Sequence, residues 1–208
     1  VKNNKIIKIT EKPKIPASNL AVTGIYLLTP YIFEVIKKLK PSWRNELEIA
    51  DALQMLIQEQ KEISFGVITD FWKDTGTPFD IIEANKFLLE KMQESFNGEK
   101  EEDVIVQGKV MIGKGTIIKK GVKIVGPTII GKNCIIEKDS LIGQNTSIGD
   151  NSQISQSNIS NSIVMSNCII KGTINMTNSI IASNSKIIQN LKEGKKSFLL
   201  GEGTQISI

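Results

Sequence analysis

The chain has 208 residues, with 26 Lys and Arg against 22 Asp and Glu, and it contains no histidine. Without imidazole there can be no Ser-His-Asp triad, no HExxH zinc site and no histidine general base. No run reaches the roughly 18 consecutive apolar residues of a membrane helix, so we expect no membrane partner. Isoleucine occupies 36 positions while aromatic residues make up 5%, a balance that favours sheet over helical bundle.

Charge divides the chain into two parts. Residues 1–103 carry 14 basic and 17 acidic groups, a net charge of −3, and residues 104–208 carry 12 and 5, a net charge of +7. The charged stretch 97–103 marks the change, so we predict domains at residues 1–98 and 99–208.

Cys134 and Cys168 have no CxxC spacing; we expect free thiols in a reducing cytoplasm, with a disulfide as the alternative.

The first part mixes strand and helix patterns. Three segments have the composition of strands: Lys5–Glu11, Ala21–Leu28 and Ile63–Ile68. The second of them is nearly all apolar, so we expect it to be buried on both faces. Helices are expected over Pro30–Leu39, over Asn45–Gln60, and from Thr77 as N-cap, with Pro78 at the first helical position, to about Phe96.

The second part repeats every six residues. An aliphatic residue stands at each sixth position, nine times in a row: Val106, Ile112, Ile118, Ile124, Ile130, Ile136, Ile142, Ile148 and Ile154. A period of 2 alone would repeat at every second residue, and a period of 3.6 does not divide six, so neither gives a strict six-residue repeat; a three-sided solenoid with six residues per side does. Gly113, Gly131 and Gly149 follow the aliphatic residue, where we expect the corner to need a small side chain.

After Ile154 the spacing of the aliphatic residues shortens. Ile159, Val164, Ile170 and Ile174 follow at steps of 5, 5, 6 and 4. Asn and Ser recur between them, and such short polar residues suit tight corners. We expect continued coils to about Ile188, a polar exit at Lys192–Lys196, and an apolar strand at Ser197–Leu200 that caps the open end of the stack.

Three ordered segments resemble one enzyme family. Residues 11–26 read EKPKIPASNLAVTGIY, residues 44–51 read RNELEIAD and residues 71–77 read FWKDTGT. This set resembles the sugar-1-phosphate nucleotidyltransferases, and within them the glucose-1-phosphate thymidylyltransferases, whose long form carries a left-handed β-helix tail. The resemblance implies an α/β fold, the C-terminal part of a Rossmann-like nucleotidyltransferase domain, followed by a left-handed parallel β-helix of hexapeptide repeats.

The resemblance also implies a reaction. A sugar 1-phosphate, expected to be glucose 1-phosphate, attacks the α-phosphorus of a nucleoside triphosphate, expected to be dTTP, and pyrophosphate leaves; a UTP-dependent uridylyltransferase is the near alternative. Catalysis by positioning and charge neutralisation requires no histidine. We therefore expect Mg²⁺ as cofactor, with a nucleoside triphosphate and a sugar 1-phosphate as partners.

The same resemblance assigns roles to seven residues. Glu11 would accept hydrogen bonds from sugar hydroxyls, Lys12 and Arg44 would hold the sugar phosphate, Val22, Gly24 and Tyr26 would line the sugar pocket, and Asp74 would be one of two carboxylates on Mg²⁺. Simpler interpretations stay open. Arg44 near Glu46 and Glu48 would be a helix-start ion pair, Asp74 a turn former and Tyr26 a core residue, while Trp72 is expected to pack.

Two family elements have no match. There is no Gly-rich loop of the GGxGTRLxPxT kind and no second metal carboxylate from an early strand, so the chain resembles the C-terminal part of a longer enzyme, inactive alone. β-helix tails of this kind assemble subunits, so we expect a homo-oligomer, with a trimer favoured. Two different functions stay open: a hexapeptide-repeat acyltransferase, which the lack of histidine disfavours, and a non-catalytic scaffold subunit. Scattered lysines without aromatic neighbours predict no nucleic-acid partner.

Overall fold

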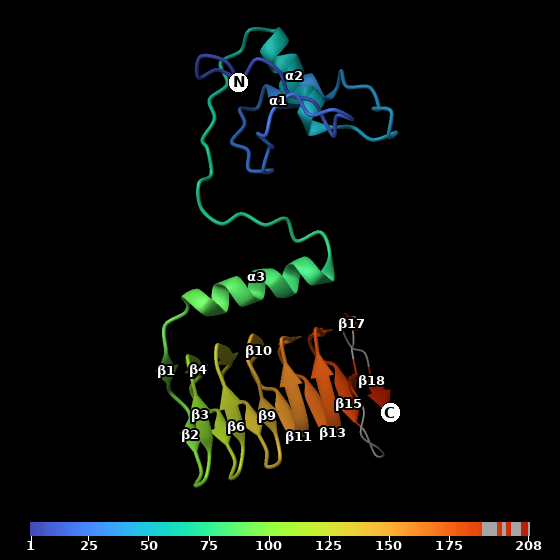
Figure 1. Ribbon diagram of the computed structural model, residues 1–208. Helices are drawn as coiled ribbons and strands as arrows, with labels where there is room; N and C mark the ends of the chain where they lie inside the picture. Colours follow the sequence, from blue (N-terminus) through green and yellow to red (C-terminus); the bar gives the residue numbers. More distant parts are fainter. Residues whose placement is uncertain (189–194, 197–198, 201–204, 208) are drawn as a thin grey trace. The chain divides into compact units, whose positions relative to one another are not determined.

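The computed structural model describes residues 1–188, 195–196, 199–200 and 205–207. The chain forms two compact units, Val1–Trp72 and Lys73–Ile208 (Figure 1). This division lies before the sequence boundary that we expected near residue 98, because a helix between these points packs on the solenoid.

The first unit is built around two helices, α1 (Ile32–Ile36) and α2 (Ile49–Gln58). Their apolar sides pack on each other, with Ile32, Val35 and Ala52 buried in the contact. Both helices lie where the sequence predicts them, and both are shorter. Asn45 has a φ of 60°, outside the right-handed helical region, so α2 begins only at Ile49.

The three strands expected in this unit are not formed, so that part of the prediction is wrong. Its one isolated backbone bridge joins Lys2 and Lys5. The apolar segment expected to be buried is instead open to solvent, with Ile25 79% and Leu27 103% exposed. A strand needs a neighbouring strand to satisfy its N–H and C=O groups, and unit Val1–Trp72 offers none in register.

The second unit begins with helix α3 (Pro78–Lys91). Thr77 is its N-cap, as the sequence predicts: its side-chain oxygen accepts from Asp80 N at 3.2 Å, and the Asp80 carboxylate accepts from Thr77 N at 3.1 Å. This reciprocal pair satisfies two backbone donors of the first turn. The helix ends at Lys91 rather than near Phe96, because Ser95 and Phe96 form the first strand of the solenoid.

The solenoid is a parallel β-helix with three rows of strands. The first row contains β1 (Ser95–Phe96), β4 (Val110–Ile112), β7 (Thr128–Ile130), β10 (Thr146–Ile148), β12 (Ile163–Val164), β14 (Ile180–Ile181) and β17 (Leu199–Leu200). The second contains β2 (Glu99–Lys100), β5 (Ile117–Ile118), β8 (Ile135–Ile136), the first parts of β11 (Gln153–Ser160) and β13 (Ile169–Thr177), β15 (Lys186–Ile188) and β18 (Gln205–Ser207). The third contains β3 (Ile105–Gln107), β6 (Lys123–Val125), β9 (Leu141–Ile142), the second parts of β11 and β13, and β16 (Lys195–Lys196).

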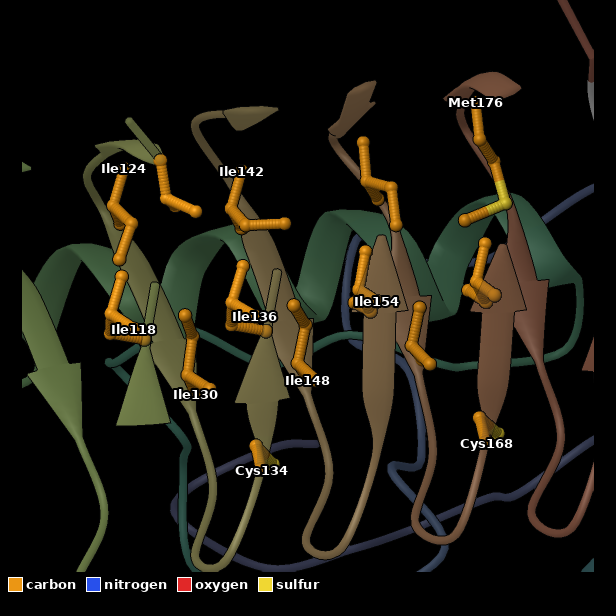
Figure 2. Packing of buried hydrophobic residues seen from close by; sticks show 14 of the residues in the cluster. Ile118, Ile124, Ile130, Cys134, Ile136, Ile142, Ile148, Ile154, Cys168 and Met176 are labelled. Atoms are coloured by element: carbon orange, nitrogen blue, oxygen red, sulfur yellow. The ribbon is translucent and has the colours of Figure 1, made fainter. Parts of the chain in front are cut away.

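The six-residue repeat forms the core of this solenoid, as predicted. Every repeat isoleucine from Ile112 to Ile154 is at most 1% exposed, and the side chains stack in columns along the axis (Figure 2). Ile136 lies in register between Ile118 and Ile154 of the neighbouring coils. Cys134 and Cys168 are buried in the same core as free thiols, which confirms that they form no disulfide.

The shortened spacing after Ile154 produces shorter coils. Ser147 pairs with Ile163, and Ile163 pairs with Ile180, whereas earlier coils pair residues 18 apart, such as Ser147 with Ile129. A register shift between Ser155 and Ser157 gives β13 one extra residue relative to β11, since Ser155 pairs with Lys171 and Ser157 with Ile174. Ile159, Val164, Ile170 and Ile174 all remain buried, so the predicted slip keeps the aliphatic side chains on the axis.

The polar exit predicted after Ile188 is wrong, whereas the strand predicted at Ser197–Leu200 is present at Leu199–Leu200. Lys195–Lys196 pairs with β13, Leu199–Leu200 with β14 and Gln205–Ser207 with β15, so these segments continue the stack, and Leu199–Leu200 is part of a coil and not a separate cap. Backbone pairing on the preceding coil does not depend on apolar side chains, which is why polar residues join it. Residues 192–194 and 197–198 of these predictions lie outside the described residues.

Asparagine and glycine form the corners. Asn133, Asn151 and Asn167 occupy equivalent corner positions with φ values of 53°, 58° and 61°, the left-handed region that Asn tolerates. Their side-chain amides hydrogen-bond along the column at 3.4 and 3.2 Å. A Cβ on Gly113 would lie 2.6 Å from the backbone of Gly131, so this corner requires glycine, as predicted.

Helix α3 is fixed to the first row of strands (Figure 1). Ser147 Oγ donates to Asn85 Oδ1 at 2.6 Å, and Asn85 Nδ2 donates to Asn145 O at 3.2 Å. Lys109 Nζ donates to the Glu90 carbonyl oxygen at 2.6 Å near the end of the helix, where a cation also complements the helix dipole. These polar contacts make α3 part of the solenoid unit.

Candidate functional site

Arg44 lies among three carboxylates of the first unit. Its Nη2 is 2.7 Å from Glu46 Oε2, and its Nη1 is 3.3 Å from Glu48 Oε1 and 3.6 Å from Glu11 Oε1. The three acids differ in exposure: the side chains of Glu46, Glu11 and Glu48 are 56%, 31% and 9% exposed. The structure therefore brings together two residues predicted for the sugar-phosphate site, Glu11 and Arg44, although they are 33 positions apart in the sequence.

A closed turn before α2 positions Arg44. Ser42 N donates to Glu46 O at 2.8 Å, and Asn45 N donates to Ser42 O at 2.9 Å. The Ser42 hydroxyl oxygen accepts from Arg44 N at 3.1 Å and donates to Glu48 Oε1 at 2.8 Å. One serine thus connects the backbone of Arg44 to the carboxylate that binds its side chain.

The other predicted residues of this unit are open to solvent. Lys12 directly follows Glu11, with a φ of 35°, and its side chain is exposed. Val22 is 54% and Tyr26 38% exposed within this unit. The assignment of Tyr26 to the sugar pocket and the alternative that it is a core residue both stay predictions. Gly24 has a φ of 80°, and no atom lies within 4 Å of a Cβ built on it. Its conformation favours glycine, and like Val22 and Tyr26 it is exposed within the unit.

Asp74 belongs to the second unit and stands just before α3. Its neighbour Lys73 pairs with Asp80, Nζ to Oδ1 at 2.7 Å, rather than with Asp74. Hydrogen bonding to Asp80 raises the pKa of Lys73, and the hydrogen bonds from Lys73 and Thr77 hold the pKa of Asp80 below its usual value. The start of the helix is therefore held by its own ion pair, and this pair does not engage the Asp74 carboxylate.

A magnesium ion would find only part of its ligand set here. Within the described part of the chain, no group of three or more His, Cys, Asp or Glu side chains is arranged to hold a metal. Asp74 supplies one carboxylate, which suits Mg²⁺ because this ion prefers oxygen ligands and takes only one or two carboxylates from a protein. The described residues thus offer one carboxylate to a magnesium site.

The side chain of Trp72, which we expected to pack against other residues, is 46% exposed.

Two residues of the Arg44 network were missed as functional candidates. Ser42 had no assigned role, and Glu48 was considered only as an ion-pair partner. The sequence does hold a signal, because acids stand two and four positions after the arginine. It does not show that Glu48 is buried while Glu46 is exposed, since this difference arises from the direction in which α2 leaves the turn.

None of the described helices has the length and apolar character needed to cross a membrane.

Comparison with protein families gives two matches. Residues 1–91 match the family described as nucleotidyl transferase, and residues 124–207 match the one described as GMPPB C-terminal domain. The first match contains all seven predicted site residues, and the second covers most of the β-helix.

Individual relatives match part of the chain. A glucose-1-phosphate thymidylyltransferase of Streptomyces antibioticus is 40% identical over 129 residues, which are 62% of this chain and 36% of the relative. The bifunctional protein GlmU of Methanocaldococcus jannaschii is 45% identical over 114 residues, 55% of this chain and 28% of the relative. The chain therefore spans about a third of the length of these relatives. A hexapeptide transferase family protein from Anaplasma phagocytophilum aligns over 53% of this chain and 69% of its own at 17% identity, with a TM-score of 0.17, too low to inform the fold.

Proposed function

We propose that this protein is a sugar-1-phosphate nucleotidyltransferase that uses dTTP and glucose 1-phosphate and releases pyrophosphate. The nucleotidyl transferase match over residues 1–91 and the β-helix that follows it in the chain support this proposal. The choice of dTTP is supported by the thymidylyltransferase relatives, and UTP is the alternative base. The observation that carries the proposal is the meeting of Glu11 and Arg44, which stand in two separate motifs of the family and come within 3.6 Å.

These residues suit a sugar 1-phosphate. The planar guanidinium of Arg44 matches two phosphate oxygens, while Lys12 adds a point charge beside it. The ionised Glu11 carboxylate only accepts hydrogen bonds, which suits sugar hydroxyls. We assign Val22, Gly24 and Tyr26 to the walls of the sugar site. Held in this way, the phosphate oxygen of the sugar would attack the α-phosphorus of the triphosphate, and positioning would supply most of the rate.

Asp74 is our proposed metal ligand. Mg²⁺ at this carboxylate would neutralise negative charge that develops on the leaving pyrophosphate. The Lys73–Asp80 pair and the Thr77 cap connect the residues on either side of Asp74 and Gly76 to the start of α3, so the carboxylate lies on a short segment that is held at both ends.

Residues 1–208 alone are proposed to be inactive. Ile25 and Leu27 are 79% and 103% exposed, and large apolar side chains in that state usually mark a surface that another part of a protein covers. We propose that polypeptide outside these residues covers this surface and binds the triphosphate. We further propose a cytoplasmic homo-oligomer, with a trimer favoured: the two buried free thiols fit a reducing compartment, and the β-helix provides long flat sides.

The test is a panel of nucleoside triphosphates and sugar 1-phosphates offered to the whole protein, with pyrophosphate release as the readout. We expect dTTP with glucose 1-phosphate to give the highest kcat/KM, and Asp74→Ala to abolish turnover, with Glu34→Ala, an exposed acid of α1, as the control. Failure of every pair to release pyrophosphate would refute the proposal. Near-normal turnover of Asp74→Ala would refute the metal assignment alone.

A further inference from the structure

Glu48 occupies the N-cap position of α2 but does not use its side chain as a cap. No side-chain capping bond is present; the carboxylate instead accepts from Ser42 Oγ at 2.8 Å and from Arg44 Nη1 at 3.3 Å. Its side chain is 9% exposed. Keeping a carboxylate away from water is costly unless it is paired and hydrogen-bonded, so the position of Glu48 is tied to the guanidinium that it binds.

Glu46 binds the same guanidinium under opposite conditions. It contacts Nη2 at 2.7 Å, but its side chain is 56% exposed, so it can exchange Arg44 for water at small cost. Of these two contacts, the one with the exposed Glu46 is therefore the one that a ligand from solvent can displace more easily. The two acids therefore differ in what a bound phosphate would do to them.

We infer that Glu48 is a positioning residue that holds the Arg44 guanidinium toward the sugar phosphate, whereas Glu46 competes with that phosphate for Arg44. This inference rests on the proposed function, in which Arg44 binds the phosphate. Glu48 and Ser42 fix the guanidinium from the buried side, so a phosphate finds it already oriented and does not have to order a long, flexible side chain. The exposed Glu46 contact is given up when the phosphate binds.

The two acids therefore have opposite predicted effects on binding of glucose 1-phosphate. Glu48→Gln, which keeps the shape and loses the charge, should raise the Kd for glucose 1-phosphate about tenfold. Glu46→Gln should leave the Kd unchanged or lower it. We would measure both by isothermal titration calorimetry on the whole protein, with melting temperatures to establish that each variant is folded. Should Glu48→Gln not fold, Ser42→Ala is the milder variant, with an expected rise of about threefold.

A double-mutant cycle separates positioning from general damage. If Glu48 acts through Arg44, adding Glu48→Gln to Arg44→Ala should change the Kd less than about twofold, because the partner is already gone. The KM for the nucleoside triphosphate should not change in Glu48→Gln. An unchanged Kd in Glu48→Gln, an equal loss in Glu46→Gln, or a full tenfold loss in the Arg44→Ala background would each overturn the inference.

Binding and turnover distinguish this inference from the proposed function. If the whole protein binds glucose 1-phosphate and Glu48→Gln weakens that binding, but no pyrophosphate is released with any nucleotide, the reaction is refuted and the positioning role stands. If pyrophosphate is released normally and Glu48→Gln binds as well as the unaltered protein, the reaction stands and the positioning role is refuted.

Discussion

Replacing Ile136 by alanine tests the central feature of the fold, the aliphatic column inside the solenoid. Ile136 is fully buried in β8, with Ile118 and Ile154 in register on the neighbouring coils. The residue before it, Ile135, lies on the same strand and is 37% exposed. The same substitution at these two adjacent positions differs mainly in whether the side chain faces the axis or the outside.

The expected losses differ severalfold. Isoleucine to alanine removes three carbons, worth about 2.4 kcal/mol at about 0.8 kcal/mol each when fully buried. The cavity left at Ile136 adds to this, because neighbours relax only partly, and brings the total to about 3–4 kcal/mol. At Ile135 no closed cavity forms, and the loss should be about 1 kcal/mol from reduced burial and strand preference.

Urea unfolding of the chain, followed by the circular dichroism of the β-sheet, provides the comparison. The transition of the solenoid should move to a lower urea concentration in both variants, and much further in Ile136→Ala. Because each coil contacts only its neighbours, a cavity in the middle of the stack also weakens the coupling between the two ends, so the transition should broaden. Equal shifts at Ile135 and Ile136 would refute the assignment of the six-residue repeat to the axis.

Three further predictions concern the second unit. Thr77→Ala should cost about 1 kcal/mol through loss of the cap, and Thr77→Ser should restore it in the same urea assay. The pKa of Asp80 is lowered and that of Lys73 raised by their pairing, so the pair stabilises the fold above the ordinary carboxyl pKa and below the ordinary lysine pKa. This contribution is lost as the pH falls through the lowered pKa of Asp80 or rises through the raised pKa of Lys73; Asp80→Asn should therefore destabilise at neutral pH and not in strong acid. Burial raises the pKa of both Cys134 and Cys168, so iodoacetamide should label neither until urea unfolds the solenoid; labelling of the folded chain would contradict their burial.

The solenoid was predictable because its rule is local and repeated. A six-residue spacing leaves one architecture that keeps every aliphatic residue inside, and the positions from Ile112 to Ile154 confirm it. The strand at Lys195–Lys196 was predicted as a polar exit, since it joins the stack by backbone pairing and has no apolar residue to indicate it. The strand expected at Ala21–Leu28 failed for the converse reason: its apolar pattern is clear, but a pattern cannot supply a pairing partner.

The candidate site was predictable only as separate motifs. The resemblance identified Glu11 and Arg44 but contained no distance between them, and the turn built on Ser42 was needed to show how Arg44 is held. Glu48 is buried because α2 begins at Ile49. The apolar stripe in the sequence had predicted that this helix begins several residues earlier. Burial and exposure of individual acids depend on such helix boundaries, which sequence patterns locate least well.

The seating of α3 limits how copies of this protein can meet. Asn85 and Lys109 fasten the helix along the first row of strands, so that side of the triangular prism is already occupied by the chain's own helix. A symmetry axis running parallel to the prism would have to face the sides formed by the second and third rows, or the edge between them. In a trimer, the three α3 helices would then lie on the outside of the assembly, and the strands would face the symmetry axis.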